Sequence, residues 1–303
     1  MNNGVLGSLS NEDIEFIKDE SSTFWRDKFT KKCKGLVVLL DILGWKNIHI
    51  SKGSRRGIKD ILKLDNNNLK PTDLIEITPI DEVVFATNKL RSLAKDIMCR
   101  VSNKPNEIIR NIDILNISDS IAIMLDLTCS GSLSYPNLFN LIRKFYNNML
   151  GKGFAIRGTI GYGEYYINSE YGIFMGEAIK DVGENFEATD WAAVTVTDKC
   201  VEAIKENNEI DNFAKKIGLI RYKNIPYKKT GANKEGYVIK PFLYEMSCGG
   251  ERQKMIWEEQ YKPIELDKIK KCKNILKEVH DKSFNTEVFM KYCIDSEDDK
   301  YKK

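Results

Sequence analysis

The sequence contains very little histidine: only His49 and His280 occur among 303 residues. Two distant histidines leave almost no material for a zinc site or for a catalytic triad that uses histidine as its base. The seven cysteines are scattered, their number is odd, and no pair has C-x-x-C spacing. We therefore expect reduced thiols in a cytoplasmic protein, without structural disulfides.

Further absences narrow the class of protein. No run of about eighteen apolar residues occurs, and the N-terminus lacks the basic-then-apolar order of a signal peptide, so no membrane association is expected. A G-x-x-x-x-G-K-[ST] phosphate loop is missing as well. Charged residues make up 30% of the chain, yet their signs nearly cancel to +3. No nucleic-acid partner is therefore required.

The hydrophobic patterns that are present alternate between helical and strand periodicity. Helices are expected over residues 10–32, 81–100, 137–150, 176–187 and 265–292, and strands over 36–40, 112–117, 121–125, 154–167, 193–196 and 237–246. This order, with a hairpin between helices, predicts an α+β fold of palm or ferredoxin-like type, in which helices flank a mixed, mostly antiparallel sheet. The expected organisation is an N-terminal helical segment (1–33), a central domain (34–250) with a polar insertion (51–80), and a C-terminal helical extension with a polar tail (251–303).

One expected strand ends on a carboxylate. The aliphatic run 36–40 leads directly into Asp41, and Asp119 lies at the turn of the expected hairpin. Burial of an unpaired carboxylate costs several kcal/mol, and two carboxylates at one sheet edge repel each other unless cations lie between them. A pair of Mg²⁺ or Mn²⁺ ions would meet this need and would support phosphoryl transfer. In the alternative interpretation, each aspartate is an ordinary turn former or helix cap.

In four motifs the sequence resembles the class III nucleotidyl cyclases. Their Asp-Ile-x-Gly-Phe motif corresponds to Asp41–Trp45, and their second metal aspartate, in a hairpin turn, corresponds to Asp119. A following strand, Arg-x-Gly-Ile-x-x-Gly, is similar to "RGTIGYGE" from Arg157, and a glycine-led helix from Gly176 precedes the strand "AVTVTD". The motifs occur in the family's order and cover residues 35–197.

This resemblance implies that residues 34–250 form a cyclase catalytic domain. Asp41 and Asp119 would bind two divalent cations, Mn²⁺ or Mg²⁺, and the backbone carbonyl of Ile42 would add a ligand. The triphosphate of a nucleotide substrate would be held by the backbone amides of Leu43, Gly44 and Trp45. The ribose 3′-hydroxyl would attack the α-phosphorus and release pyrophosphate. The family's site lies between two subunits, which implies a homodimer with composite active sites.

The departures from the family pattern are informative. Where the family's helix carries Asn and, four residues later, Arg, this chain has Lys180 and Glu184. Lys180 is expected to supply a catalytic positive charge, whereas Glu184 cannot replace an arginine. Clear equivalents of the purine-reading Lys and Asp are missing too. The chain thus looks like the bacterial pyrimidine cyclases of Pycsar antiphage defence, which make cyclic UMP or cyclic CMP for a separate effector. The alternatives are an adenylate or guanylate cyclase in ordinary signalling and a non-catalytic nucleotide-binding module.

Four further side chains have two interpretations each. Trp45 either packs beneath the turn or stacks on a base. Arg157 is expected to pair with a carboxylate at the edge of the core, with ligand contact as the alternative. Lys228 or Lys229 either lies in a charged hairpin loop or binds phosphate.

Overall fold

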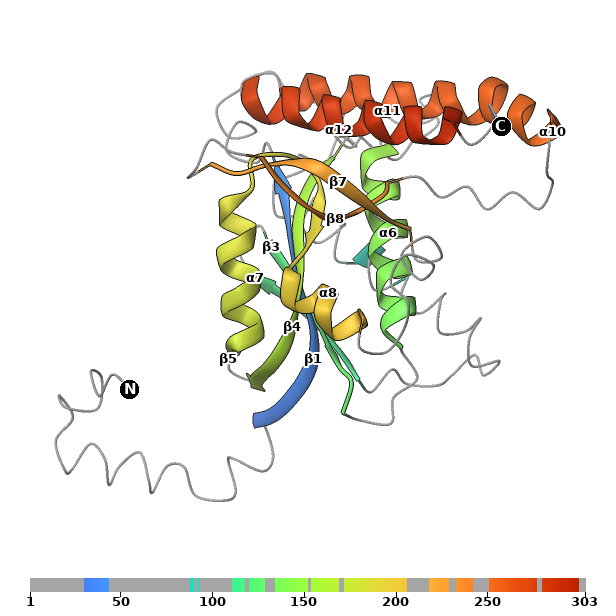
Figure 1. Ribbon diagram of the computed structural model, residues 1–303. Coiled ribbons are helices and arrows are strands. Elements are labelled where there is room, and N and C mark those ends of the chain that lie inside the picture. The colour runs from blue at the N-terminus through green and yellow to red at the C-terminus, as the bar shows by residue number, and fades with distance from the viewer. Residues whose placement is uncertain are drawn as a thin grey trace, which may run out of the picture.

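The computed structural model describes residues 30–43, 88–89, 92, 111–117, 120–128, 134–151, 154–168, 172–205, 218–228, 233–241, 251–276 and 280–299. Its strands form one sheet of eight, with helices on both faces and along one end (Figure 1). The insertion 51–80 and residues 10–29 of the first expected helix lie outside the described residues. Of the helix expected over 81–100, residues 88, 89 and 92 are described, and all three are helical.

The first half of the sheet has the ferredoxin-like arrangement that the sequence predicts. Its strands are β1 (Thr30–Leu43), β2 (Ile112–Ile117), β3 (Ser120–Asp126) and β4 (Ala155–Asn168). They lie in the order β2-β3-β1-β4 with every neighbouring pair antiparallel, and helix α6 (Tyr135–Gly151) connects β3 to β4. This order is that of the βαββαβ unit. The predicted hairpin and the helix expected over 137–150 are therefore confirmed.

The second half of the sheet continues from β4. Strand β6 (Val194–Val196) is parallel to β4, and β8 (Asn233–Ile239) and β7 (Leu219–Pro226) follow as antiparallel neighbours. Strand β5 (Ile173–Gly176) pairs with the far end of β4. Helices α7 (Glu177–Ala188) and α8 (Asp198–Lys205) flank β6 in the sequence. The predicted mixed, mostly antiparallel sheet is thus confirmed.

Strand β1 is buried on both faces. Leu36, Val38 and Leu40 face a large core that includes α6, whereas Val37 faces a second core with Val182 of α7. A continuous aliphatic run is typical of a strand that is covered on both sides. The run therefore places the end of β1, and with it Asp41, within the middle of the sheet.

The glycines of β4 allow α7 to lie directly on the strand. A Cβ atom at Gly161 would come within 2.5 Å of Val182 Cγ2, and one at Gly163 would lie 3.3 Å from the backbone nitrogen of Ala178. Gly163 also has φ 156°, which L side chains rarely adopt. The missing side chains at these glycines thus allow the close contact that fixes α7 along β4.

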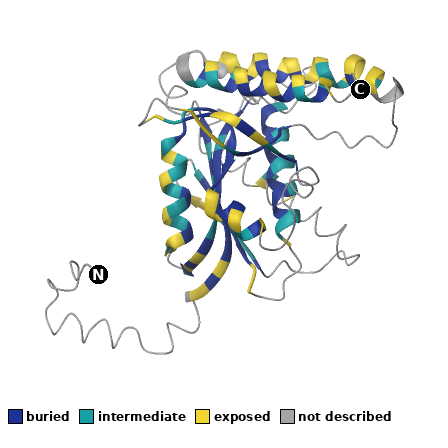
Figure 2. Cartoon of the chain, viewed as in Figure 1, coloured by how far each residue is buried: buried dark blue, intermediate teal, exposed yellow. Residues whose placement is uncertain are grey.

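The C-terminal extension is a layer of helices over the end of the sheet where β1 finishes (Figure 1). It consists of α10 (Glu251–Ile256), the π-helical turn η3 (Trp257–Tyr261), α11 (Lys262–Ile275) and α12 (His280–Asp298). Figure 2 shows buried residues on the side facing the sheet and exposed residues on the outer side. None of the helices that the structure describes is long and apolar enough to cross a membrane.

Several boundaries differ from the sequence predictions. Residues 30–32, expected to be the end of a helix, are strand, because β1 pairs with β4 as far as Thr30 and Asn168. The helical pattern expected over 265–292 corresponds to two helices, α11, which begins earlier and ends at Ile275, and α12, which begins at His280. The elements β5, β7 and α8 were not predicted from the sequence.

Candidate active site

Asp41 lies near the end of β1, between two antiparallel neighbours. Its cross-strand partners are Ser120 in β3 and Arg157 in β4. The side chain of Asp41 is only 13% exposed. A carboxylate at this level of burial requires compensating charge or hydrogen bonds.

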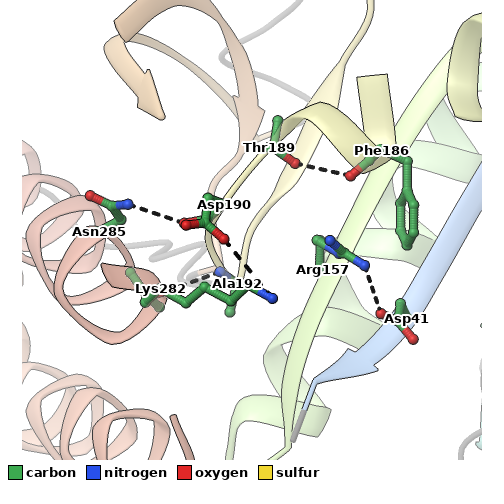
Figure 3. A network of polar contacts seen from close by, with 9 residues as sticks. Asp41, Arg157, Phe186, Thr189, Asp190, Ala192, Lys282 and Asn285 are labelled. Carbon is green, nitrogen blue, oxygen red and sulfur yellow. Dashed lines mark hydrogen bonds and ion pairs between the residues drawn. The ribbon is translucent and has the colours of Figure 1, made fainter. Parts of the chain in front are cut away.

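Arg157 provides part of that compensation. Its Nη2 donates a hydrogen bond to Oδ2 of Asp41 over 3.0 Å, and its guanidinium lies 4.3 Å from the ring centroid of Phe186, at the end of α7 (Figure 3). The Arg157 side chain is 12% exposed, and its Nε is buried without a hydrogen-bond partner in the described part of the chain. The expectation that Arg157 pairs with a carboxylate at the edge of the core is confirmed.

The second predicted metal ligand, Asp119, lies outside the described residues together with Ser118, whereas Ile117 and Ser120 on either side are described. Ser120 is the cross-strand partner of Asp41, and Ile117 pairs with Ser120 at the end of the hairpin. The described residue opposite Asp41 is therefore the one that follows Asp119 in the sequence. The metal role of Asp119 stays a prediction.

The residues that follow Asp41 are divided between the described and undescribed parts of the chain. Ile42 and Leu43 are 3% and 8% exposed and pair with β4 opposite Ile156 and Ala155. Gly44 and Trp45 lie outside the described residues. The carbonyl ligand at Ile42 and the triphosphate-binding amides from Leu43 onward therefore stay predictions.

Lys180 projects from α7 into solvent. Its side chain is 76% exposed, and its ammonium lies 3.9 Å from Glu184 one turn later. The same helix reaches the Asp41 site with Phe186. The catalytic role of Lys180 stays a prediction.

A lysine that the sequence did not single out lies beside Arg157. Lys282 of α12 is 21% exposed, and its ammonium is 3.9 Å from Oδ1 of Asp190 (Figure 3). Burial lowers the pKa of Lys282 below its ordinary 10.5, and the positive charge of Arg157 adds to this effect. Lys228 acts in the same direction, whereas the carboxylates of Asp190 and Asp41 oppose it. No sequence signal could have found Lys282, because its position depends on how α12 packs against the sheet.

The described residues fit a divalent cation only in part. Among them, no group of three or more acidic, cysteine or histidine side chains is placed to hold a metal ion. Asp41 offers one carboxylate, the hard oxygen ligand that Mg²⁺ and Mn²⁺ prefer. A metal site here therefore needs a second carboxylate from the neighbouring hairpin, where Asp119 occurs in the sequence.

Comparison with known proteins gives only distant likenesses. No family model and no curated protein matches the chain. Among solved structures, the guanylyl cyclase Cya2 is 11% identical with a TM-score of 0.38, over 69% of this chain and 92% of that one. The catalytic core of a rhodopsin-guanylyl cyclase with converted specificity, in complex with ATPαS, is 13% identical with a TM-score of 0.37, over 69% and 97%.

A third solved structure is a class III adenylyl cyclase-like ATP-binding protein from Pseudomonas aeruginosa. It is 11% identical with a TM-score of 0.30, over 58% of this chain and 35% of that one. Such low identities and TM-scores do not place the chain in a family.

Proposed function

We propose that this protein is a nucleotidyl cyclase, which converts a ribonucleoside triphosphate into its 3′,5′-cyclic mononucleotide and pyrophosphate. The observation that carries the proposal is the register of β1 and β3. Asp41 of β1 faces Ser120, the first residue of β3, and Ser120 directly follows Asp119 in the sequence. This register supports the proposal that the carboxylates of Asp41 and Asp119 share a pair of cations.

The reaction uses these residues in separate roles. Asp41 and Asp119 would hold two Mn²⁺ or Mg²⁺ ions, which when bound lower the pKa of the attacking hydroxyl and neutralise triphosphate charge. The ribose 3′-oxygen forms a bond to the α-phosphorus, and its proton passes to solvent. The bond between the α-phosphorus and the α,β-bridging oxygen breaks, and pyrophosphate leaves with the electron pair.

The finer assignment is a pyrimidine cyclase. UTP or CTP would be the substrate, and cyclic UMP or cyclic CMP would activate a separate effector in antiphage defence. What supports this choice is the resemblance of the sequence, together with the replacement of the family's Asn and Arg by Lys180 and Glu184. The exposed position of Lys180 supports a homodimer in which each subunit completes the other's site.

The test is a product assay with the full chain. The purified protein is incubated with Mn²⁺ and each of the four ribonucleoside triphosphates, and products are identified by chromatography and mass spectrometry. We expect cyclic UMP or cyclic CMP. Asp41→Asn and Asp119→Asn should each lower turnover by at least about a hundredfold, the scale of losing a metal ligand or an electrostatic catalytic group.

The matched control is Asp267→Asn, since Asp267 is an exposed acid on α11 that pairs with Lys271. It should keep wild-type turnover. Cyclic AMP or cyclic GMP as the main product would replace the pyrimidine assignment by a purine one. Full turnover in Asp41→Asn would remove the metal role and with it the proposed reaction.

One observation favours a second candidate, a nucleotide-binding module without catalysis. Arg157 already supplies Asp41 with a positive charge at 3.0 Å, so the carboxylate has a cation even without a metal. In that case the protein would bind a nucleoside triphosphate in calorimetry, yet none of the four triphosphates would yield a cyclic product.

A further inference from the structure

The N-terminal part of α12 is held against the segment that follows α7. Asn285 Nδ2 donates a hydrogen bond to the carbonyl of Asp190 over 3.1 Å, and the backbone N–H of Ala192 donates to Thr286 Oγ1 over 2.8 Å (Figure 3). One turn further along, Phe289 packs on Trp191 with ring centroids 4.9 Å apart. These contacts join backbone, side-chain and aromatic groups within one short segment. The helix is therefore a fixed part of this end of the sheet.

The packing of α12 against residues 190–192 points the side chain of Lys282 toward the sheet. Thr286 donates a hydrogen bond to the carbonyl of Lys282 over 2.6 Å, which ties the lysine to the same turn that contacts Ala192. The Lys282 side chain extends toward Asp190 and Arg157, as Figure 3 shows. Most exposed lysines extend into water, so an inward-pointing ammonium at 21% exposure requires a reason.

Lys282 and the charged groups that act on it carry more positive than negative charge. Arg157 already pairs with Asp41 at 3.0 Å, whereas Lys282 is 3.9 Å from Asp190, too far for a hydrogen bond. Lys228 adds a further positive charge that acts on Lys282. An anion bound between these cations would relieve their mutual repulsion, and the phosphates of a nucleotide are anions of this kind.

We propose that Lys282 contacts a phosphate group of the nucleoside triphosphate, so that the C-terminal helix α12 is part of the active site. This inference rests on the proposed function. Lys228, which keeps a phosphate-binding interpretation from the sequence, would assist from the end of β7. The metal-holding carboxylate and the phosphate-binding lysine then come from opposite ends of the chain.

The experiment uses inorganic tripolyphosphate as a probe that needs no base and no chemistry. Binding to the full chain is measured by calorimetry in the presence of Mg²⁺, alongside the product assay with the four triphosphates. Lys282→Gln should weaken tripolyphosphate binding by about tenfold to a hundredfold, the scale of one charge-assisted hydrogen bond. Lys282→Arg should restore most of it. The control is Lys291→Gln on the same helix, because Lys291 is 58% exposed and pairs with Glu287.

A structural role for Lys282, as the partner of Asp190, predicts a different pattern. If the lysine served only to neutralise Asp190, Asp190→Asn would weaken tripolyphosphate binding as much as Lys282→Gln does. If the lysine binds phosphate, Asp190→Asn removes a competing carboxylate, and tripolyphosphate should bind as tightly as to the wild type or more tightly. A loss of tripolyphosphate binding in Asp190→Asn equal to that in Lys282→Gln would overturn the inference.

The two proposals fail separately. If Lys282→Gln loses tripolyphosphate binding while the wild type yields no cyclic product, the phosphate contact stands and the cyclase does not. If the wild type is a cyclase and Lys282→Gln keeps its kcat and KM, the cyclase stands and the phosphate contact does not. Wild-type protein that binds no tripolyphosphate would also refute the contact.

Discussion

Asp41 and Arg157 face each other across β1 and β4 and form an ion pair of 3.0 Å, although 116 positions separate them in the sequence. Both side chains are nearly buried, at 13% and 12% exposure. In this pair the guanidinium of Arg157 neutralises the carboxylate of Asp41, the proposed metal ligand at this end of the sheet. If Asp41 binds a divalent cation as proposed, the cation has to compete with Arg157 for the carboxylate.

Replacement of this arginine should make stability depend on metal. We expect Arg157→Gln to lower the free energy of unfolding by about 2 kcal/mol in EDTA, because a nearly buried carboxylate loses a charge partner. Added Mn²⁺ should restore more stability to this variant than to the wild type, since the ion can take the arginine's place. Urea unfolding with and without Mn²⁺ measures both effects.

Arg221→Gln is the control for that comparison, because Arg221 is 64% exposed and pairs with Glu235 at 3.0 Å on the surface. Exposed pairs contribute about 0–1 kcal/mol. Its stability should change little and should not respond to Mn²⁺ differently from the wild type. An Arg157→Gln protein that behaves in the same way would contradict a metal site at Asp41.

Composite active sites can be tested by mixing two inactive variants. Asp41→Asn lacks the proposed metal ligand, and Lys180→Gln lacks the exposed lysine of α7. If each site uses Asp41 of one subunit and Lys180 of the other, a mixed dimer contains one intact site. Mixing should then restore up to about a quarter of wild-type turnover, from the statistics of random pairing of subunits. Activity that remains at the level of the separate variants would show that both residues act within one subunit.

The charge state of Lys282 should be visible in stability as a function of pH. Its pKa is lowered below 10.5 in the folded protein, so between the lowered value and 10.5 the unfolded chain binds more protons than the folded one. The contribution of Lys282 to the free energy of unfolding therefore rises as pH increases through that window. At neutral pH the positive charge of Lys282 lowers the free energy of unfolding. Lys282→Gln should equal or exceed the wild type in thermal stability at pH 7.5, with the difference diminishing toward pH 10.5. A clear loss of stability at pH 7.5 would indicate that the Asp190 contact dominates.

The contact between β4 and α7 predicts opposite effects for two glycine substitutions. At Gly161 an added Cβ atom would meet Val182 at 2.5 Å, whereas at Gly183 it would meet nothing within 4 Å. Gly161→Ala should cost about 1–3 kcal/mol through overpacking. Gly183→Ala, within α7, should stabilise by about 0.5–1 kcal/mol through helix propensity. Chemical denaturation of the two variants compares them directly, and equal effects would contradict the described packing.

The thiols offer a test of burial. Burial raises the pKa of Cys33 and Cys272 to about 12, and it raises the pKa of Cys200 and Cys293 even further above the ordinary value. These four buried thiols should resist Ellman's reagent at pH 8, because the thiolate is the reactive form. Native protein should then react rapidly at no more than the remaining three of its seven cysteines, and unfolded protein at all seven. Rapid native labelling of Cys272 or Cys293, located by mass spectrometry, would contradict the docking of α11 and α12.

Much of the fold could be predicted from the sequence because its information is local. The aliphatic run before Asp41 indicates a strand buried on both faces, and α6 carries its apolar residues on one side. The hairpin of β2 and β3 follows from two β-rich segments that a short turn separates. In each case the apolar pattern that indicates the element lies within one short stretch of sequence, even where the strand's hydrogen bonds go to distant segments.

The composition of the site depended on tertiary structure. The strand β1 was predicted, but nothing in it indicates that residue 157 rather than another faces Asp41, because register is decided by pairing between distant segments. Helix α12 is a stronger case. Its apolar residues point both outward and inward, with Phe284 59% exposed and Phe289 fully buried. The packing of Phe289 on Trp191 determines which face of α12 meets the sheet. That orientation in turn places Lys282 beside Arg157, which the sequence alone does not indicate.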